Sequence, residues 1–302
     1  MNKIRKWSWL VIAVTVFSLI LATGCGGAGI TAQPGGKTPA AASAGAPVTV
    51  KVLDVGQGDA ILIRTKDQVV LIDTGDVPAR DKLVSMLKSQ GISTIDKLII
   101  THPHADHIGG AAALFEHFSV KQVYDSGQKT TSNLYKQYLT QIQKRNIPFS
   151  VVTAGTTIEL GNEAALNVLA PEQPFIGGSE PDLNNNSIVA KLVYGNFSMM
   201  LTGDAEQESE ERMLKKGAAN LKSTLLKSGH HGSKTSSSVP FLQAVSPEAA
   251  LISLGANNDY HHPHPSTLKK YNEKKIKVYR TDTDGTLTVT TDGKTYAIAK
   301  ER

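Results

Sequence analysis

Residues 101–110 carry the side chains best suited to chemistry. They read Thr-His-Pro-His-Ala-Asp-His-Ile-Gly-Gly, so three imidazoles and one carboxylate lie between His102 and His107. Neutral imidazole and carboxylate are ligands that zinc, manganese and iron accept. The apolar run 98–100 precedes them and predicts a buried strand with a loop at its end. A chance surface cluster of histidines rarely sits between such a strand and a glycine pair, so the pattern favours a metal site.

Further polar groups also follow apolar runs. Asp73 comes after residues 69–72, Asp204 follows Leu-Thr-Gly at 201–203, and His230 and His231 follow residues 225–227. The two aspartates also have plainer interpretations: Asp73 can be a turn residue, and Asp204 can be the N-cap of the next helix. His117 lies beside Phe118 on an expected helix, and we interpret it as structural.

The elements that must position these groups begin with three short strands over 48–54, 60–64 and 69–73. Helices are expected over 81–90, 108–118 and 132–145, and a Glu-rich one over 205–216. Short strands at 197–201, 225–228, 250–253 and 277–279 alternate with helices, and a hairpin over 286–299 turns at Asp292-Gly293. Strands lead and then alternate with helices, twice over. This order predicts two packed mixed sheets flanked by helices, an αββα sandwich, in one domain over 48–302.

The run His-x-His-x-Asp-His at 102–107 resembles the signature of the metallo-β-lactamase superfamily. Asp73-Thr-Gly, Leu201-Thr-Gly-Asp204 and His230-His-Gly-Ser233 resemble its first, fourth and fifth motifs. The chain is most similar to the extracellular hydrolase domain of ComEC-type competence proteins. The matching stretches are Asp-Val-Gly-Gln-Gly-Asp at 54–59, Asn-Asn-Asn-Ser at 184–187, Lys-Ser-Gly-His-His-Gly-Ser at 227–233 and His-Pro-His at 262–264.

The resemblance implies two divalent ions, zinc or manganese. One would be held by His102 and His104. The other would be held by Asp106, His107 and His230, with Asp204 bridging the two. Asp73 would orient the histidine loop without touching either ion. His230 and His231 cannot easily bind the same ion, so His231 is expected either to contact substrate or to support the ligands without touching an ion.

The third motif departs from most of the superfamily. A histidine is usual there, whereas only His117 lies between His107 and His230, and the matching stretch offers asparagines. Asn184 and Asn186 are therefore expected to bind substrate or to replace the missing donor. Catalytic roles are expected for Asp106, Asp204, His231 and His262, and His264 is expected to contact substrate.

The amino terminus has its own signals. Lys3, Arg5 and Lys6 precede an apolar run over 7–22, and Leu-Ala-Thr-Gly-Cys at 21–25 resembles a bacterial lipobox. We predict a signal peptide over 1–24, a lipid on Cys25 and a Gly/Ala/Pro linker over 25–47. An uncleaved anchor or an ordinary secretory signal remains the alternative. The domain is then expected on the extracellular face of the bacterial cytoplasmic membrane, or secreted.

Composition adds limits. Cys25 is the one cysteine, so an internal disulfide and a cysteine metal cluster are excluded. Beyond residue 24 the chain has 29 basic and 27 acidic residues, too even a balance to indicate nucleic acid by charge alone.

The function expected is an exported metal-dependent hydrolase that cleaves a phosphodiester such as DNA, as the ComEC resemblance implies. One alternative is a phosphoesterase of cell-wall polymers or lipid head groups. Another is a metal-stabilised binding protein without turnover. The membrane is reached through the lipid anchor, and no protein partner is predicted.

Overall fold

A computed structural model of the chain describes residues 47–177 and 182–302. The expected signal peptide, Cys25 and almost all of the expected linker lie outside these ranges. The described part begins with β1, whose first residue is Val48.

The first sheet has eight strands among the described residues, in the order β17-β16-β1-β2-β3-β5-β7-β8. Pairing is antiparallel from β17 to β3 and parallel from β3 to β8. The bounds are β1 (Val48–Val52), β2 (Ile61–Arg64), β3 (Val69–Ile72), β5 (Lys97–Ile100), β7 (Val123–Asp125), β8 (Phe149–Val151), β16 (Leu287–Thr291) and β17 (Tyr296–Lys300).

The second sheet has seven strands among the described residues, in the order β15-β14-β13-β12-β11-β10-β9. Here β9 to β12 pair antiparallel, and β12 to β15 pair parallel. The bounds are β9 (Thr157–Glu159), β10 (Ala165–Ala170), β11 (Val189–Tyr194), β12 (Phe197–Leu201), β13 (Leu225–Lys227), β14 (Ala249–Ile252) and β15 (Lys277–Arg280). A small parallel pair joins β4 (Thr94–Ile95) to β6 (Ser119–Val120).

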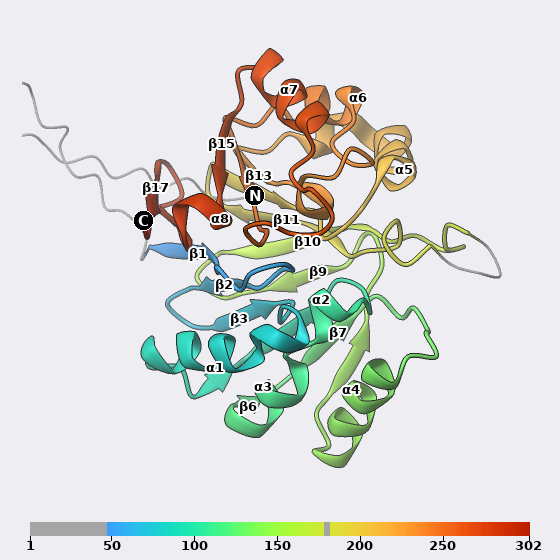
Figure 1. The fold of residues 1–302 in the computed structure, drawn as a ribbon, viewed down its shortest axis with the longest axis vertical. Coiled ribbons are helices and arrows are strands. Elements are labelled where there is room, and N and C mark those ends of the chain that lie inside the picture. Colours follow the sequence, from blue (N-terminus) through green and yellow to red (C-terminus); the bar gives the residue numbers. More distant parts are fainter. Residues whose placement is uncertain (1–46, 178–181) are drawn as a thin grey trace, which may run out of the picture. The chain divides into compact units, whose positions relative to one another are not determined.

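Helices cover the outer face of each sheet (Figure 1). The first sheet carries α1 (Arg80–Ser89), α2 (Ala105–Ile108), α3 (Ala111–His117) and α4 (Asn133–Lys144). The second carries α5 (Gln207–Gly217), α6 (Val239–Val245) and α7 (Pro265–Glu273). The short α8 (Thr281–Asp284) connects β15 to β16. The αββα sandwich predicted from the sequence is confirmed.

The core between the sheets follows from residue alternation. In β1, Val48, Val50 and Val52 are fully buried while the two residues between them are half-buried, as period-2 strands require. Residues of both sheets join them in one apolar cluster. Each buried Val, Ile or Leu contributes about 1.5–3 kcal/mol. The all-buried pattern of β14 is that of a parallel strand covered on both faces.

The single helix expected over 108–118 is wrong, because α2 and α3 are separate helices with Gly109 and Gly110 between them. A Cβ on Gly109 would lie 2.2 Å from Val77 N, and one on Gly110 would lie 2.4 Å from Thr74 O. The glycine pair therefore lets the chain after β3 approach the histidine loop.

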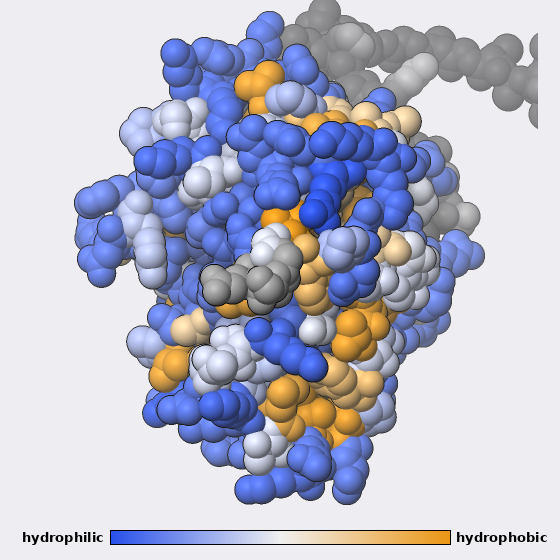
Figure 2. Space-filling model, turned by 90° about the vertical axis from the view of Figure 1, so that its right-hand side faces the viewer, coloured by the Kyte–Doolittle hydropathy of each residue, from blue (hydrophilic) through white to orange (hydrophobic). Residues whose placement is uncertain are grey.

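Figure 2 shows hydrophilic residues over most of one face, with hydrophobic residues gathered in smaller areas. Large hydrophobic side chains are exposed at five described positions: Val77, Phe149, Val151, Val239 and Tyr260. Tyr260 is the most exposed of these, at 62%. Within the described ranges, no helix is both long and apolar enough to cross a membrane.

Candidate metal centre

Five loops that follow the carboxyl ends of parallel strands build the centre. They come after β3 and β5 in the first sheet and after β12, β13 and β14 in the second. The carboxyl ends of parallel strands are where sheets of this kind usually place ligand sites. Together the loops bring Asp73, residues 102–107, Asp204, residues 230–231 and His262 to one place.

Asp73 fixes the histidine loop from behind. Its carboxylate accepts hydrogen bonds from the backbone N of Thr101 at 2.8 Å and from the Thr101 hydroxyl at 2.7 Å. Its Oδ2 also lies 2.8 Å from His107 Nδ1. Burial raises the pKa of Asp73, and the neighbouring His107 opposes that shift. The Nε2 atom of His107 is thereby turned away from Asp73 and toward Asp204.

Asp204 lies at the middle of the centre and is almost completely buried. Its Oδ2 is 3.2 Å from Nε2 of His107, 3.5 Å from Nε2 of His231 and 3.9 Å from Nε2 of His102. Burial disfavours the charged carboxylate, but His231 and His107 hold its pKa well below the ordinary value. Asp204 Oδ2 is also 3.8 Å from Nε2 of His230. One carboxylate oxygen therefore faces four imidazoles from two loops.

His231 and His230 occupy different surroundings. Nε2 of His231 lies 3.1 Å from Asp106 Oδ2, and its Nδ1 lies 2.9 Å from the Ser253 carbonyl oxygen. Burial disfavours protonation of His231, but Asp204 and Asp106 raise its pKa to about 10, so the cluster attracts positive charge.

His230 instead turns its Nδ1 to Glu206 Oε1 at 2.8 Å, and it is partly exposed. Its hydrogen bond lowers the pKa of Glu206. Two sets of side chains among the described residues have ligand atoms within 4.8 Å of one another. One comprises Asp59, Asp73 and His107, and the other comprises Asp106, His107, Asp204 and His231. The geometry thus favours the reverse of the sequence-based assignment, with His231 among the ligands and His230 beside them.

His102 and His104 form the other half. Nε2 of His102 lies 3.0 Å from Nδ1 of His104, so the two ring nitrogens converge. Behind the ring, His102 Nδ1 is 3.2 Å from the Thr101 hydroxyl and 3.3 Å from the Ser187 hydroxyl. The Ser187 hydroxyl also accepts a hydrogen bond from the backbone N of Asp204.

These residues fit divalent ions. Nε2 of His107 and Oδ1 of Asp204 are buried polar atoms without a hydrogen-bond partner in the described part of the chain. Such atoms are costly unless they bind something. Imidazole nitrogens supported through Nδ1 and carboxylate oxygens are the donors that zinc and manganese accept. The His/Asp cluster is therefore able to bind metal ions.

The asparagines after residue 183 point to different places. Asn184 lines the cleft above the centre, and its Oδ1 is buried without a partner in the described residues. Asn185 accepts hydrogen bonds from the backbone N of Glu206 and of Ser209 at the start of α5. The role expected for Asn186 is wrong, because its side chain holds the loop together and does not face the centre. Its Oδ1 accepts a hydrogen bond from the backbone N of Ile176, and its Nδ2 donates to the carbonyl oxygens of Ile176 and Asp182.

A cleft of about 290 Å³ opens over the cluster. Its lining residues are Gln57, His104, Ala105, Asp106, Asn184, Asp204, His230, His231, Tyr260 and His262. His262 is within the cleft, and burial lowers its pKa to about 4. His264 is not among the lining residues, and its Nδ1 accepts a hydrogen bond from the backbone N of Lys234. The expectation that His264 contacts substrate in this cleft has no support in the structure.

Several residues of the centre were not predicted from the sequence. Asp59 and Lys227 form a fully buried ion pair of 2.8 Å, and Asp59 Oδ1 lies 3.5 Å from His231 Nδ1. Both residues stand inside stretches quoted for the ComEC resemblance, and that was the available signal. Glu206 and Tyr260 belong to no recognised motif, so no signal in the sequence indicated them.

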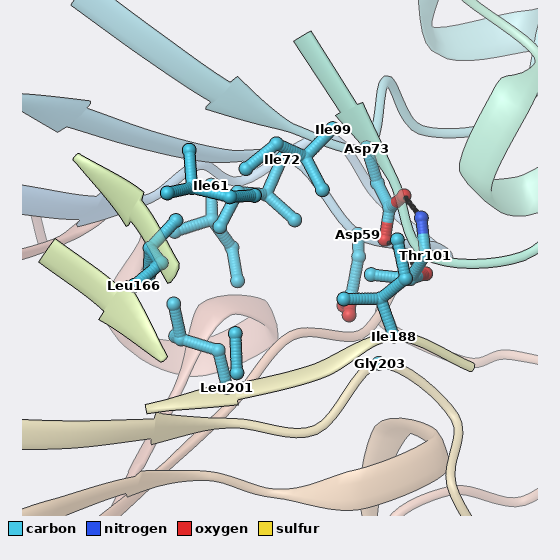
Figure 3. A pocket seen from close by; sticks show the side chains of 12 residues that line it. Asp59, Ile61, Ile72, Asp73, Ile99, Thr101, Leu166, Ile188, Leu201 and Gly203 are labelled. Carbon is cyan, nitrogen blue, oxygen red and sulfur yellow. Dashed lines mark hydrogen bonds between the residues drawn. The ribbon is translucent and has the colours of Figure 1, made fainter. Parts of the chain in front are cut away.

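The inter-sheet core reaches the underside of the centre. A small enclosed cavity of about 10 Å³ lies between the sheets. Figure 3 shows Ile61, Leu166 and Leu201 at one end and Asp59, Asp73 and Thr101 at the other. The carboxylates thus stand at the border between apolar core and metal centre, where packing fixes their positions.

Comparisons with known proteins agree with this geometry. The model of the metallo-beta-lactamase superfamily matches residues 53–256. ComE operon protein 3 of Bacillus subtilis is 34% identical over 256 residues, which cover 79% of this chain and 32% of that protein. Competence protein ComA of Neisseria gonorrhoeae is 31% identical over 251 residues, covering 79% and 31%. The chain thus spans about a third of the length of these relatives.

Solved structures show the same fold. The metallo-beta-lactamase fold protein YhfI from Bacillus subtilis superposes with a TM-score of 0.55 at 14% identity, covering 80% of this chain and 99% of YhfI. CmlA, a diiron beta-hydroxylase from Streptomyces venezuelae, gives 0.53 at 15% identity, covering 77% and 52%. From the matched residues and the shared fold, the chain belongs to the metallo-β-lactamase superfamily and is related to ComEC-type competence proteins.

Proposed function

We propose that this chain is an exported metal-dependent phosphodiesterase that cleaves a nucleic-acid backbone such as DNA. The observation that carries the proposal is that two sets of metal donors share Asp204 at the base of one cleft. Shared ligands between adjacent ions are typical of hydrolytic phosphodiester chemistry. Relatives named competence protein ComA and recombination protein 2 support DNA as the substrate.

We assign His102, His104 and Asp204 to one divalent ion. Asp106, His107 and His231, again with Asp204, are assigned to the other, and zinc and manganese are the candidate metals. When bound, such ions lower the pKa of water and polarise a phosphoryl oxygen. The protein fixes the donors in advance, because Nδ1 of His107 is held by Asp73 and Nδ1 of His231 by the Ser253 carbonyl.

His230 is the candidate proton donor to the leaving oxygen. Its Nδ1 is held by the Glu206 carboxylate, which leaves Nε2 on the side of the cleft, 3.8 Å from Asp204 Oδ2. A carboxylate behind an imidazole orients the ring. Glu206 is itself held by the Thr235 hydroxyl at 2.8 Å, so the pair is fixed before substrate binds.

Asn184 and His262 are placed to contact the phosphate. The amide of Asn184 is a neutral donor on the wall of the cleft. His262 has a pKa of about 4, so at neutral pH it is uncharged and acts through a neutral N–H group. Both are suited to orient a phosphodiester that carries a single negative charge.

Membrane anchoring through Cys25 remains part of the proposal. It is motivated by the lipobox-like residues 21–25. A fatty-acid analogue supplied to the cells should label the wild-type protein and leave Cys25→Ala unlabelled. Equal labelling of both proteins would contradict a lipid on this residue.

A substrate panel tests the enzymatic proposal. The full chain is assayed with zinc or manganese against bis-p-nitrophenyl phosphate, p-nitrophenyl phosphorylcholine and nitrocefin, with chelator-treated protein as the control. We expect cleavage of bis-p-nitrophenyl phosphate that chelator abolishes and added metal restores. Preference for the phosphorylcholine ester would favour the lipid or wall-polymer alternative. If no substrate is cleaved with either metal, the result would favour a binding protein without turnover.

A further inference from the structure

One wall of the cleft is a row of nearly parallel rings. The centroids of His231 and His262 lie 6.3 Å apart with an angle of 29° between the ring planes. The centroids of His262 and Tyr260 lie 5.7 Å apart, with an angle of 24°. Both pairs have the separation of offset-stacked aromatic rings. The row therefore begins within the metal cluster and ends at Tyr260.

Tyr260 is left open at the outer end of this row. It lines the cleft together with Asp106, Asp204 and His231, yet 62% of the residue is exposed. A single exposed aromatic residue would mean little by itself, because such residues are normal on surfaces. What distinguishes Tyr260 is that His262 covers one side of its ring while the stack has no next member among the described residues.

The loop that carries Tyr260 is fixed before any ligand arrives. The side chain of Asn258 donates to the carbonyls of Gly255 and His262 and accepts from the backbone N of His262. Gly255 packs against Gln57, where a Cβ would lie 2.8 Å from the backbone N. Both the loop and Gln57 border the cleft, so the backbone that carries Tyr260 does not need to be ordered at the moment of binding.

The next member of a stack must be planar, aromatic and close to the centre. Building on the proposed function, we infer that Tyr260 is a stacking platform for a nucleobase next to the scissile phosphodiester. A base within a duplex is stacked on its neighbours and cannot rest on Tyr260 without being unpaired. The substrate class is therefore an unpaired stretch of nucleic acid, such as a single strand or a frayed end. Stacking on an aromatic ring tolerates every base, so little sequence preference is expected.

The test separates stacking from cleavage. Single-stranded oligonucleotides, intact or with one abasic position moved along the strand, are cleaved by the full chain with manganese, and kcat and KM are measured. For Tyr260→Ala we expect KM on intact strands to rise about 5- to 150-fold, the range of a lost base-stacking contact, with a smaller change in kcat. Tyr260→Phe should behave as wild type. Phe149→Ala, an exposed aromatic residue outside the cleft, is the matched control.

The abasic strands identify the contact. At one position along the strand, the missing base should raise the KM of wild type as much as Tyr260→Ala does, and the two defects together should not exceed either alone. If no abasic position matters, or if Tyr260→Ala lowers cleavage of the intact strand and of every abasic strand equally, the platform is wrong. Bis-p-nitrophenyl phosphate distinguishes failure of the proposed function from failure of the stacking platform. A wild-type protein that cleaves neither this compound nor DNA contradicts the proposed phosphodiesterase. A wild-type protein that cleaves both without dependence on a base contradicts only the role of Tyr260.

Discussion

The ammonium nitrogen of Lys227 lies 2.8 Å from Oδ2 of Asp59, and both side chains are fully buried beneath the metal centre. The same nitrogen donates to the Ser228 carbonyl at 2.9 Å. Asp59 also donates its backbone N to the Asp106 carbonyl, and its Oδ1 faces His231 Nδ1 at 3.5 Å. The ion pair therefore supports two of the proposed ligands from the side of the core.

Lys227→Met keeps most of the volume and removes the charge, which leaves Asp59 buried without its partner. We expect the free energy of unfolding to fall by about 3–5 kcal/mol, as for other broken buried pairs. Urea unfolding in the presence of chelator measures this without a contribution from metal binding. The double variant Asp59→Asn/Lys227→Met removes both charges and should recover most of the loss. If the double variant is as unstable as Lys227→Met, the loss in free energy of unfolding comes from packing and not from the unpaired charge.

His230→Ala and His231→Ala are a matched pair at adjacent positions. We expect His231→Ala to retain one ion per chain after dialysis, because it removes a donor from the set with Asp106, His107 and Asp204. His230→Ala should retain both ions and lose turnover, since it removes the imidazole oriented by Glu206. Elemental analysis and hydrolysis of bis-p-nitrophenyl phosphate measure the two effects. The opposite pattern of metal loss would restore His230 as the ligand.

Asp204→Asn keeps the size of the side chain and removes its charge. Since Asp204 Oδ2 faces Nε2 of His102, His107 and His231, its loss disturbs both proposed ions at once. Substitutions at groups shared by a catalytic unit commonly cost several orders of magnitude in rate. We expect such a loss in kcat on bis-p-nitrophenyl phosphate. More than about a tenth of wild-type activity at full metal content would be inconsistent with a bridging role.

The parts of the fold that local pattern determines could be predicted. The alternation of β1 and the apolar runs before Asp73 and Asp204 indicated strands, and their order predicted the sandwich. The one helix expected over 108–118 failed because its break depends on a distant contact. The backbone at Thr74 and Val77 packs onto Gly109 and Gly110, and no pattern within the helix reveals this.

The site divides in the same way. The run 102–107 concentrates its donors locally and was recognisable. The choice between His230 and His231 depends on backbone torsions, since both have positive φ within one tight turn that points their rings in different directions. Asn184 and Asn186 likewise diverge because they belong to a turn. Spacing along the chain carries no information about where such side chains point.

Asp125 ends β7 and is nearly fully buried, with its carboxylate accepting hydrogen bonds from Gly127 N at 2.7 Å and the Tyr138 hydroxyl at 3.1 Å. Burial raises its pKa to about 6. An unfolded chain has a pKa of about 3.9 for Asp, so the folded protein binds the extra proton between about pH 4 and pH 6. The stability that comes from this proton is present below about pH 4 and is lost as the pH rises through about 6.

Asp125→Asn keeps the shape of the side chain and removes the charge that burial disfavours. Its free energy of unfolding should exceed that of wild type at pH 8 by about 3 kcal/mol, and by about half as much at pH 5. Urea unfolding of both proteins with chelator at the two pH values measures the difference. Asp96→Asn is the control of opposite sign. Burial disfavours the charged form of Asp96, but the hydrogen bonds from Lys121 and from the backbone N of Val69, with the charge of Lys121, together lower its pKa. That variant should lose stability relative to wild type as the pH rises through the acid range. A constant gap between Asp125→Asn and wild type from pH 5 to pH 8 would show that Asp125 does not titrate in this window.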